Sequence, residues 1–213
     1  MPLYTTEALI LRTYALGETD RIVVFLTRDR GKKRGIAKHA KRSRRRFGGA
    51  LEPMTFGRVG YVERERRELV QLSYVEPVRS PMTVARGDGL VYVPYFADLI
   101  DQWAPEADPN EPLFRLGVSV IEAMAAGVTP DLLARYFEHW LLRLQGVYQP
   151  DPQVSEEAQA FLATARRSSP MDLSGLEPSR QTLRELEATH RVAIARHLER
   201  DLKSARVLRE AIR

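Results

Sequence analysis

The chain has 213 residues, of which 44% are hydrophobic and 29% are charged, so it can bury a sizeable core and is too apolar to be disordered throughout. It contains no cysteine, which excludes disulfides, thiolate nucleophiles and cysteine-ligated zinc. The N-terminus lacks a signal-peptide pattern and no apolar run reaches 18 residues, so we expect a cytoplasmic protein without membrane contact.

The first 80 residues are expected to form short strands. Runs rich in apolar and β-branched residues, bounded by turns, predict strands over 7–14, 21–27, 33–40, 55–63 and 69–78. Turns are expected over 17–20, 28–31 and 64–67, and a long basic loop over 41–53. Five strands with a long connection between the third and the fourth predict a small barrel of the OB-fold type. An SH3-like barrel is the nearest alternative, because periodicity alone does not separate the two.

The rest of the chain is expected to be helical. Apolar residues at helical spacing predict helices over 91–103 and 113–124. Thr129, Ser155 and Ser179 are each placed to begin a further helix, and the segment from Val207 to Ile212 predicts a final turn or two. The fold class expected is therefore α+β, with an OB-fold over 1–80 and an all-helical domain over 81–213.

Positive charge is concentrated in the strand-rich part. Residues 1–80 carry 18 Lys and Arg against 9 Asp and Glu, whereas residues 81–213 carry 15 against 19. Segment 28–46 alone holds eleven basic residues and one acid. A cluster this dense repels itself and is relieved by a polyanion, so the sequence predicts nucleic-acid binding rather than a solvated loop. The predicted DNA-binding residues are Lys32, Lys33, Arg34, Lys38, Lys41, Arg42, Arg44, Arg45 and Arg46, with Phe47 as the stacking residue.

The sequence offers no pattern for catalysis. None of the four histidines stands in metal-binding spacing, and no nucleotide-binding or nucleophile motif is present. Acidic pairs such as Glu156 and Glu157 do not share a helix face. We therefore expect a protein that is not an enzyme and needs no cofactor.

The chain resembles the RecO family of bacterial recombination mediators over nearly its whole length. The matching stretches keep their order and spacing, and they lie at 8–14, 17–20, 25–31, 35–42, 49–53, 135–138 and 202–204. The resemblance implies an N-terminal OB-fold, a helical C-terminal domain, and a nucleoid-associated protein of the bacterial cytoplasm. It implies binding of single- and double-stranded DNA, annealing of complementary strands, and loading of RecA onto DNA coated by single-stranded-DNA-binding protein (SSB).

The resemblance also implies partners. RecR would be the working partner, RecA would be reached indirectly, and the C-terminal tail of SSB would be bound by an apolar groove with basic residues in the helical domain. Arg135 falls on a motif position, and its neighbourhood adds Leu141, Leu142, Lys203 and Arg206 as SSB-tail residues. An ordinary surface charge is the alternative interpretation of Arg135 and Lys203.

One departure from the family concerns zinc. Many members carry a four-cysteine zinc module, and the corresponding segment here, within 148–178, is short and has no cysteine. The resemblance therefore implies that this module is absent.

Two other functions fit the residues. The helical part would be the true interface of an adaptor that docks SSB and RecR, with incidental DNA contact. Alternatively the chain would be an RNA-binding OB-fold protein, because basic charge does not distinguish RNA from DNA.

Overall fold

The structure is a computed structural model that describes residues 2–63, 68–84 and 87–212. The chain divides into two compact units, one made of residues 1–84 and 97–118 and the other of residues 85–96 and 119–213. The turn predicted at 64–67 lies outside the described residues. Among the described residues, no helix is both long and apolar enough to cross a bilayer.

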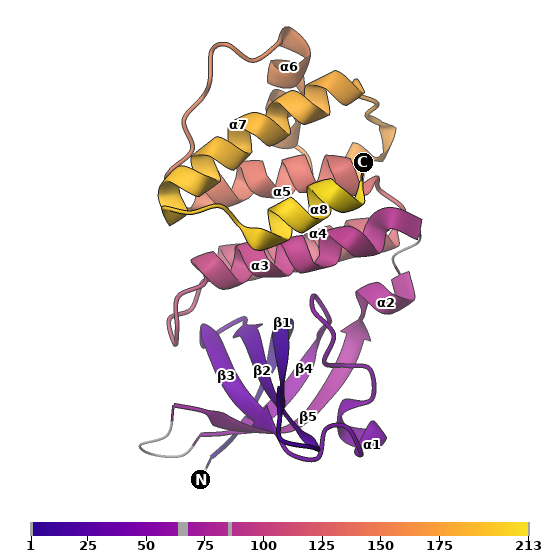
Figure 1. Cartoon of the computed structure of the whole chain (residues 1–213), viewed down its shortest axis with the longest axis vertical. Coiled ribbons are helices and arrows are strands. Elements are labelled where there is room, and N and C mark those ends of the chain that lie inside the picture. Colours follow the sequence, from indigo (N-terminus) through magenta and orange to yellow (C-terminus); the bar gives the residue numbers. More distant parts are fainter. Residues whose placement is uncertain (1, 64–67, 85–86, 213) are drawn as a thin grey trace. The chain divides into compact units, whose positions relative to one another are not determined.

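The first unit contains a closed five-stranded barrel (Figure 1). Its strands are β1 (Leu3–Leu16), β2 (Asp20–Thr27), β3 (Lys32–Ala37), β4 (Phe56–Val62) and β5 (Val70–Arg79). They follow the order β1-β2-β3-β5-β4, with β1 also pairing with β4 and β3 pairing in parallel with β5. This is the OB-fold, so the predicted fold class is confirmed.

The barrel closes around alternate side chains of its strands. Ile10, Phe25, Val59, Tyr61 and Leu72 are buried in this core. Such β-branched and aromatic residues at every second position form strands because they pack well on a pleated surface. Register irregularities occur at Ile10/Arg12 and twice between β4 and β5, and bulges of this kind bend the long strands enough to close the barrel.

The third strand is shorter than predicted. The sequence predicts an extended segment over 33–40, but β3 ends at Ala37 because His39 takes a left-handed backbone with φ of 54°. The connection from β3 to β4 then contains α1 (Arg44–Phe47), a single turn within the predicted loop, and α1 packs beside β5 (Figure 1).

Helical segments belong to the first unit as well. Residues 97–103 of α3 (Val93–Trp103) and residues 111–118 of α4 (Glu111–Ala125) are part of it. Gly117 of α4 lies so close to Leu9 and Ile100 that a Cβ there would be 2.7 Å and 2.9 Å from their side chains. These helical segments therefore bury side chains against the barrel.

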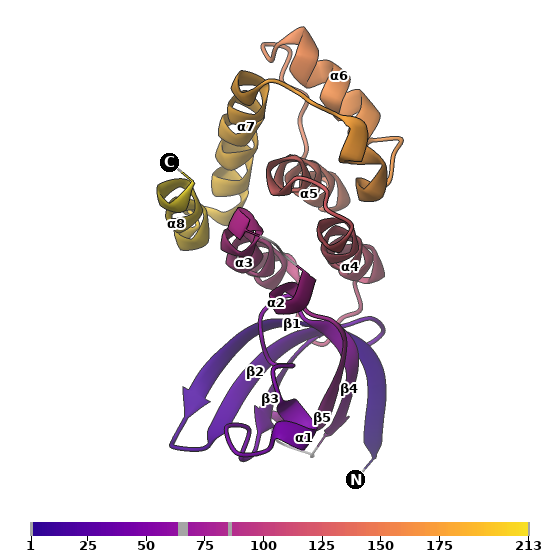
Figure 2. The ribbon, with the colours of Figure 1, turned by 90° about the vertical axis from the view of Figure 1, so that its right-hand side faces the viewer.

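The second unit is helical. It contains η1 (Gly87–Tyr92), α5 (Pro130–Leu144), α6 (Glu156–Ala165), η2 (Pro170–Gly175), α7 (Arg180–Leu198) and α8 (Lys203–Ala211), whereas α2 (Pro81–Val84) belongs to the first unit. The serine caps are confirmed, since Ser155 accepts the N–H of Ala158 at 3.3 Å and Ser179 accepts that of Thr182 at 3.2 Å. Thr129 precedes α5 without capping it through its side chain. Figure 2 shows α5 with α6 and α7 beside it.

Gly31 gives the first stability prediction. It has φ of +67°, and a Cβ there would lie 2.3 Å from the backbone nitrogen of Asp108. Gly31→Ala combines a strained backbone with a clash against main chain, so we expect it to lower the free energy of unfolding by about 3 kcal/mol. Gly17→Ala is the matched control, because Gly17 has φ of +59° and open space around it, and about 1 kcal/mol is expected. Urea denaturation measures both; equal losses would contradict the packing argument.

Candidate nucleic-acid interface

The basic loop between β3 and β4 is held to the barrel by a few local contacts. The N–H of Lys41 donates to the carbonyl of Thr19 at 3.1 Å, and the N–H of His39 donates to Asp20 Oδ1 at 2.8 Å. This hydrogen bond from His39 is the main cause that lowers the pKa of Asp20. These bonds join the loop to the β1–β2 turn and fix where its cations lie.

Phe47 anchors α1. Its side chain is 2% exposed and belongs to the barrel core, with Ala50 and Leu51 next to it. The predicted stacking role of Phe47 therefore needs correction, because a ring buried among apolar side chains presents no face to a base. The sequence did not show this, since an aromatic residue beside a basic run has the same pattern in either role.

Burying Phe47 turns the adjoining basic side chains outward. Lys38, Lys41, Arg42, Arg44 and Arg45 are exposed, and within the described residues none of them forms an ion pair with a carboxylate. Arg46 differs, because its guanidinium donates to Ser43 Oγ at 2.9 Å and to the Lys38 carbonyl at 2.8 Å, and lies 5.0 Å from the Phe47 ring centroid. Arg46 therefore braces the loop, and the other five cations face solvent.

A polar groove lies beside this loop. It has a volume of about 620 Å³ and is lined by Thr13, Arg21, Ala40, Lys41, Arg44, Phe47, Gly48, Gly49, Leu51, Glu52 and Pro53. Three of its lining residues are cationic and one is acidic. Arg21 was not among the predicted DNA-binding residues, because in the sequence it is only the first residue of an apolar strand; the barrel brings it beside the loop.

Three predicted DNA-binding residues are committed to ion pairs in the first unit. Lys32 Nζ donates to the carbonyl of Asp101 at 2.7 Å and lies 3.3 Å from its carboxylate, and Lys33 Nζ lies 2.9 Å from Glu63. Arg34 pairs with Glu106 at 3.3 Å, where both side chains are more than half exposed, so this contact is weak. Of these three residues, Arg34 is exposed, whereas Lys32 and Lys33 are partly buried.

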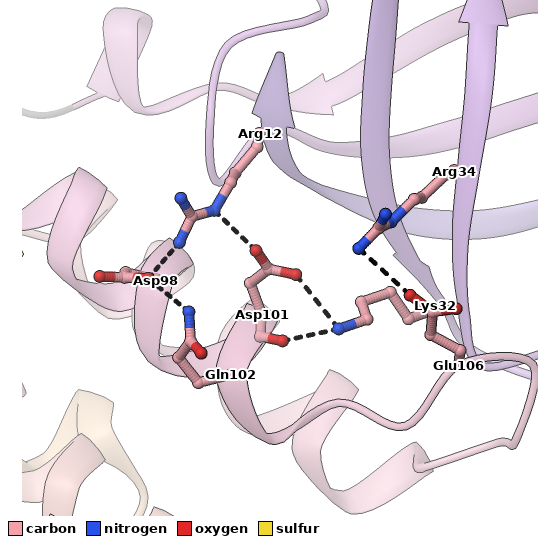
Figure 3. A network of polar contacts seen from close by, with 7 residues as sticks. All are labelled: Arg12, Lys32, Arg34, Asp98, Asp101, Gln102 and Glu106. Atoms are coloured by element: carbon pink, nitrogen blue, oxygen red, sulfur yellow. Dashed lines mark hydrogen bonds and ion pairs between the residues drawn. The ribbon is translucent and has the colours of Figure 1, made fainter. Parts of the chain in front are cut away.

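Figure 3 shows the network that holds Lys32. The guanidinium of Arg12 pairs with Asp98 and, at 2.6 Å, with Asp101, which also contacts Lys32. Partial burial opposes the charge on Arg12, but the two carboxylates outweigh it and raise the pKa of Arg12. The acids come from α3, far along the chain, so the sequence could not show that they neutralise this end of the basic segment.

The predicted SSB-tail residues do not form one exposed site. Arg135 has a side chain that is 5% exposed, with Nη2 at 2.9 Å from Glu138 Oε1 and Nη1 at 4.0 Å from Glu187. Leu141 and Leu142 are 0% exposed. Lys203 and Arg206 are exposed on α8. Arg135, Leu141 and Leu142 are therefore corrected to internal residues, because α5 is buried along nearly its whole length.

The buried carboxylate of Glu138 gathers the polar groups of this core. It accepts the Tyr95 hydroxyl at 2.7 Å and pairs with His190 Nδ1 at 3.0 Å as well as with Arg135. Burial opposes the charge of Arg135, but Glu138 and the other acids raise its pKa. Arg135 is thus held charged inside the helical unit.

Two family models match the chain. The model described as Recombination protein O N terminal matches residues 1–81, and the one described as Recombination protein O C terminal matches residues 85–153. The chain belongs to the RecO family. Its resemblance to that family, inferred from short stretches, is confirmed.

Several RecO relatives are similar in sequence. The DNA repair protein RecO of Koribacter versatilis is 43% identical over 150 residues, which is 68% of this chain and 59% of the relative. The DNA repair protein RecO of Anaeromyxobacter sp. is 38% identical over 65% of this chain and 55% of the relative. That of Pelotomaculum thermopropionicum is 33% identical over 76% of this chain and 62% of the relative. The chain thus spans between one half and two thirds of these relatives.

The segment at 148–178 does not fit a four-cysteine zinc site. The sequence has no cysteine to supply thiolate ligands. The segment instead buries Val154 just before α6, Ala158, Phe161 and Leu162 within α6, and Leu173 within η2. In the described part of the chain, no three His, Asp or Glu side chains are grouped to hold a metal.

Proposed function

We propose that this RecO-family chain is a DNA-binding protein of DNA repair that performs no covalent chemistry. The observation that carries the proposal is the set of five exposed cations that have no carboxylate partner among the described residues, Lys38, Lys41, Arg42, Arg44 and Arg45, beside the polar groove. Phosphates are the ligand class that such a set neutralises, with release of counterions. The relatives' name, DNA repair protein RecO, supports DNA as the polyanion.

The proposed mechanism is charge neutralisation. Two DNA strands repel each other, and a surface that holds phosphates of both lowers that repulsion and speeds pairing. Strand annealing, loading of RecA onto SSB-coated DNA, and partnership with RecR and the SSB tail are further parts of this proposal. For the SSB tail, Lys203 and Arg206 are the exposed residues of the predicted set.

A salt titration tests the proposal. Five phosphate contacts on a single strand predict a slope of about −3.5 in a plot of log binding constant against log salt concentration. Fluorescence anisotropy with a labelled oligonucleotide measures this slope between about 50 and about 300 mM NaCl, a range that spans physiological salt. A matched RNA oligonucleotide is the competitor. No binding at low salt, or a flat slope, contradicts DNA binding, and stronger binding of RNA favours the RNA-binding alternative.

A further inference from the structure

Three arginines come together at the ends of two helices in the helical unit. Arg143 lies in the last turn of α5, and Arg166 and Arg167 directly follow α6; all three are exposed. Trp140 Nε1 of α5 donates to the Ala165 carbonyl at 3.0 Å, and this bond ties the end of α6 to α5. The hydroxyl of Tyr136 donates to the Ser168 carbonyl at 3.3 Å, which holds the following residues as well.

Aromatic rings lie among these arginines. The guanidinium carbon of Arg143 is 5.8 Å from the ring centroids of both Trp140 and Tyr148, which are each part-exposed. The Tyr148 ring is fixed by an edge contact with buried His139, whose ring centroid is 4.6 Å away. We call Trp140, Arg143, Tyr148, Arg166 and Arg167 the arginine–aromatic patch.

The arginines of this patch affect the pKa values of two neighbouring side chains, His139 and Tyr148. Burial lowers the pKa of His139 to about 3, and the other causes are His190, Arg143 and Arg166. Burial raises the pKa of Tyr148, and the positive charges of Arg166 and Arg143 partly offset this rise. The two arginines therefore act on the same ring from different helices.

The nearby acids do not neutralise the patch. Asp151 Oδ1 accepts the N–H of Gln153 at 2.9 Å, and Asp172 accepts the N–H and hydroxyl of Ser169 at 2.9 Å. Across residues 87–212, none of the three arginines forms an ion pair with a carboxylate. A cation at a helix C-terminus stabilises the helix by about 0.3–1 kcal/mol. That effect accounts for Arg143 at the end of α5 and for Arg166, which is the C-cap of α6, but it does not require the two part-exposed rings beside Arg143.

We propose that the arginine–aromatic patch is a second nucleic-acid contact, which holds one single strand of DNA while the barrel loop holds another. Arginines beside part-exposed aromatic rings match the alternating phosphates and bases of an unpaired strand. An acidic peptide would pair with the same arginines, so peptide contact is an outcome of the test below and not the proposal. The inference rests on the proposed function and deepens it, because annealing requires two strands to be bound at once.

Charge reversal in the full chain tests the second contact. The patch variant is Arg143→Glu/Arg166→Glu/Arg167→Glu. The matched control is Arg180→Glu/Arg184→Glu/Arg191→Glu, which reverses three exposed arginines of α7, none of which lies over an aromatic ring of the described residues. Annealing of two complementary oligonucleotides is followed by fluorescence energy transfer, and binding of one short strand by anisotropy. Circular dichroism and thermal unfolding verify the fold, and the milder Arg143→Gln/Arg166→Gln/Arg167→Gln repeats the test if the reversal unfolds the chain.

We expect the patch variant to anneal about tenfold more slowly than the control, while its binding of one short strand stays within about twofold of the control. Equal annealing rates in patch variant and control would overturn the second contact and leave the barrel proposal standing; the patch would then contact protein or solvent. Loss of short-strand binding together with annealing would also overturn it, since both strands would then share one surface. A wild-type chain that binds no DNA would overturn both proposals.

Discussion

We expect Lys41→Glu/Arg44→Glu to bind single-stranded DNA on the order of 100-fold more weakly than the wild type near 0.1 M salt. Both residues line the groove, both are exposed, and neither has a carboxylate partner within the described residues. The change removes two cations that would neutralise phosphates and adds two negative charges. The slope of log binding constant against log salt concentration should become shallower, from about −3.5 to about −2, because each neutralised phosphate of a single strand contributes about −0.7.

The control for this prediction is Arg79→Glu/Arg115→Glu. These arginines are exposed in the same unit but do not line the groove. Both double variants change the net charge by the same amount, so the long-range electrostatic attraction of DNA falls equally in both. We expect this control to bind DNA less than about fivefold more weakly than the wild type. Anisotropy across the same salt range measures both variants. Equal weakening in the two variants would show that binding follows net charge rather than this groove.

Arg135→Met is expected to lower the free energy of unfolding by about 3–5 kcal/mol. The guanidinium is buried against Glu138, and its removal leaves a carboxylate that is 1% exposed without its cation. The prediction separates two roles of this residue. A surface arginine that binds an acidic tail would be replaced at little cost to stability, whereas an internal one would not.

Two further variants make this measurement decisive. Arg206→Met replaces an exposed arginine from the same predicted site and should change stability by no more than about 0.5 kcal/mol. Arg135→Met/Glu138→Gln removes both charges, so it should regain part of the lost stability, with Tyr95 and His190 still beside the new amide. Denaturation by urea gives all three values. The internal role is refuted if Arg135→Met and Arg206→Met unfold alike.

Local pattern was enough to predict most of the elements. Alternating β-branched and aromatic residues located the five strands to within a few residues, except at the ends of β1 and β3. The serine caps placed the starts of α6 and α7, because a side-chain oxygen that accepts a backbone N–H is a local device. The final helix, α8, is longer than the predicted turn or two. The sequence showed only part of it, because α8 has few apolar residues and buries only Leu208 within its bounds.

For the candidate nucleic-acid interface, the sequence alone determined less than it did for the strands and helices. Composition by itself determined that residues 1–80 carry a net positive charge, because the number of charged residues does not depend on how the chain folds. Only the tertiary structure decided which cations remain available: Asp101 of α3 takes up Lys32 and Glu63 takes up Lys33, whereas Lys41 and Arg44 keep no such partner among the described residues. It also placed Phe47 and Arg135 inside, because a side chain's burial depends on neighbours that are distant in sequence, and a single sequence does not say which neighbours will meet.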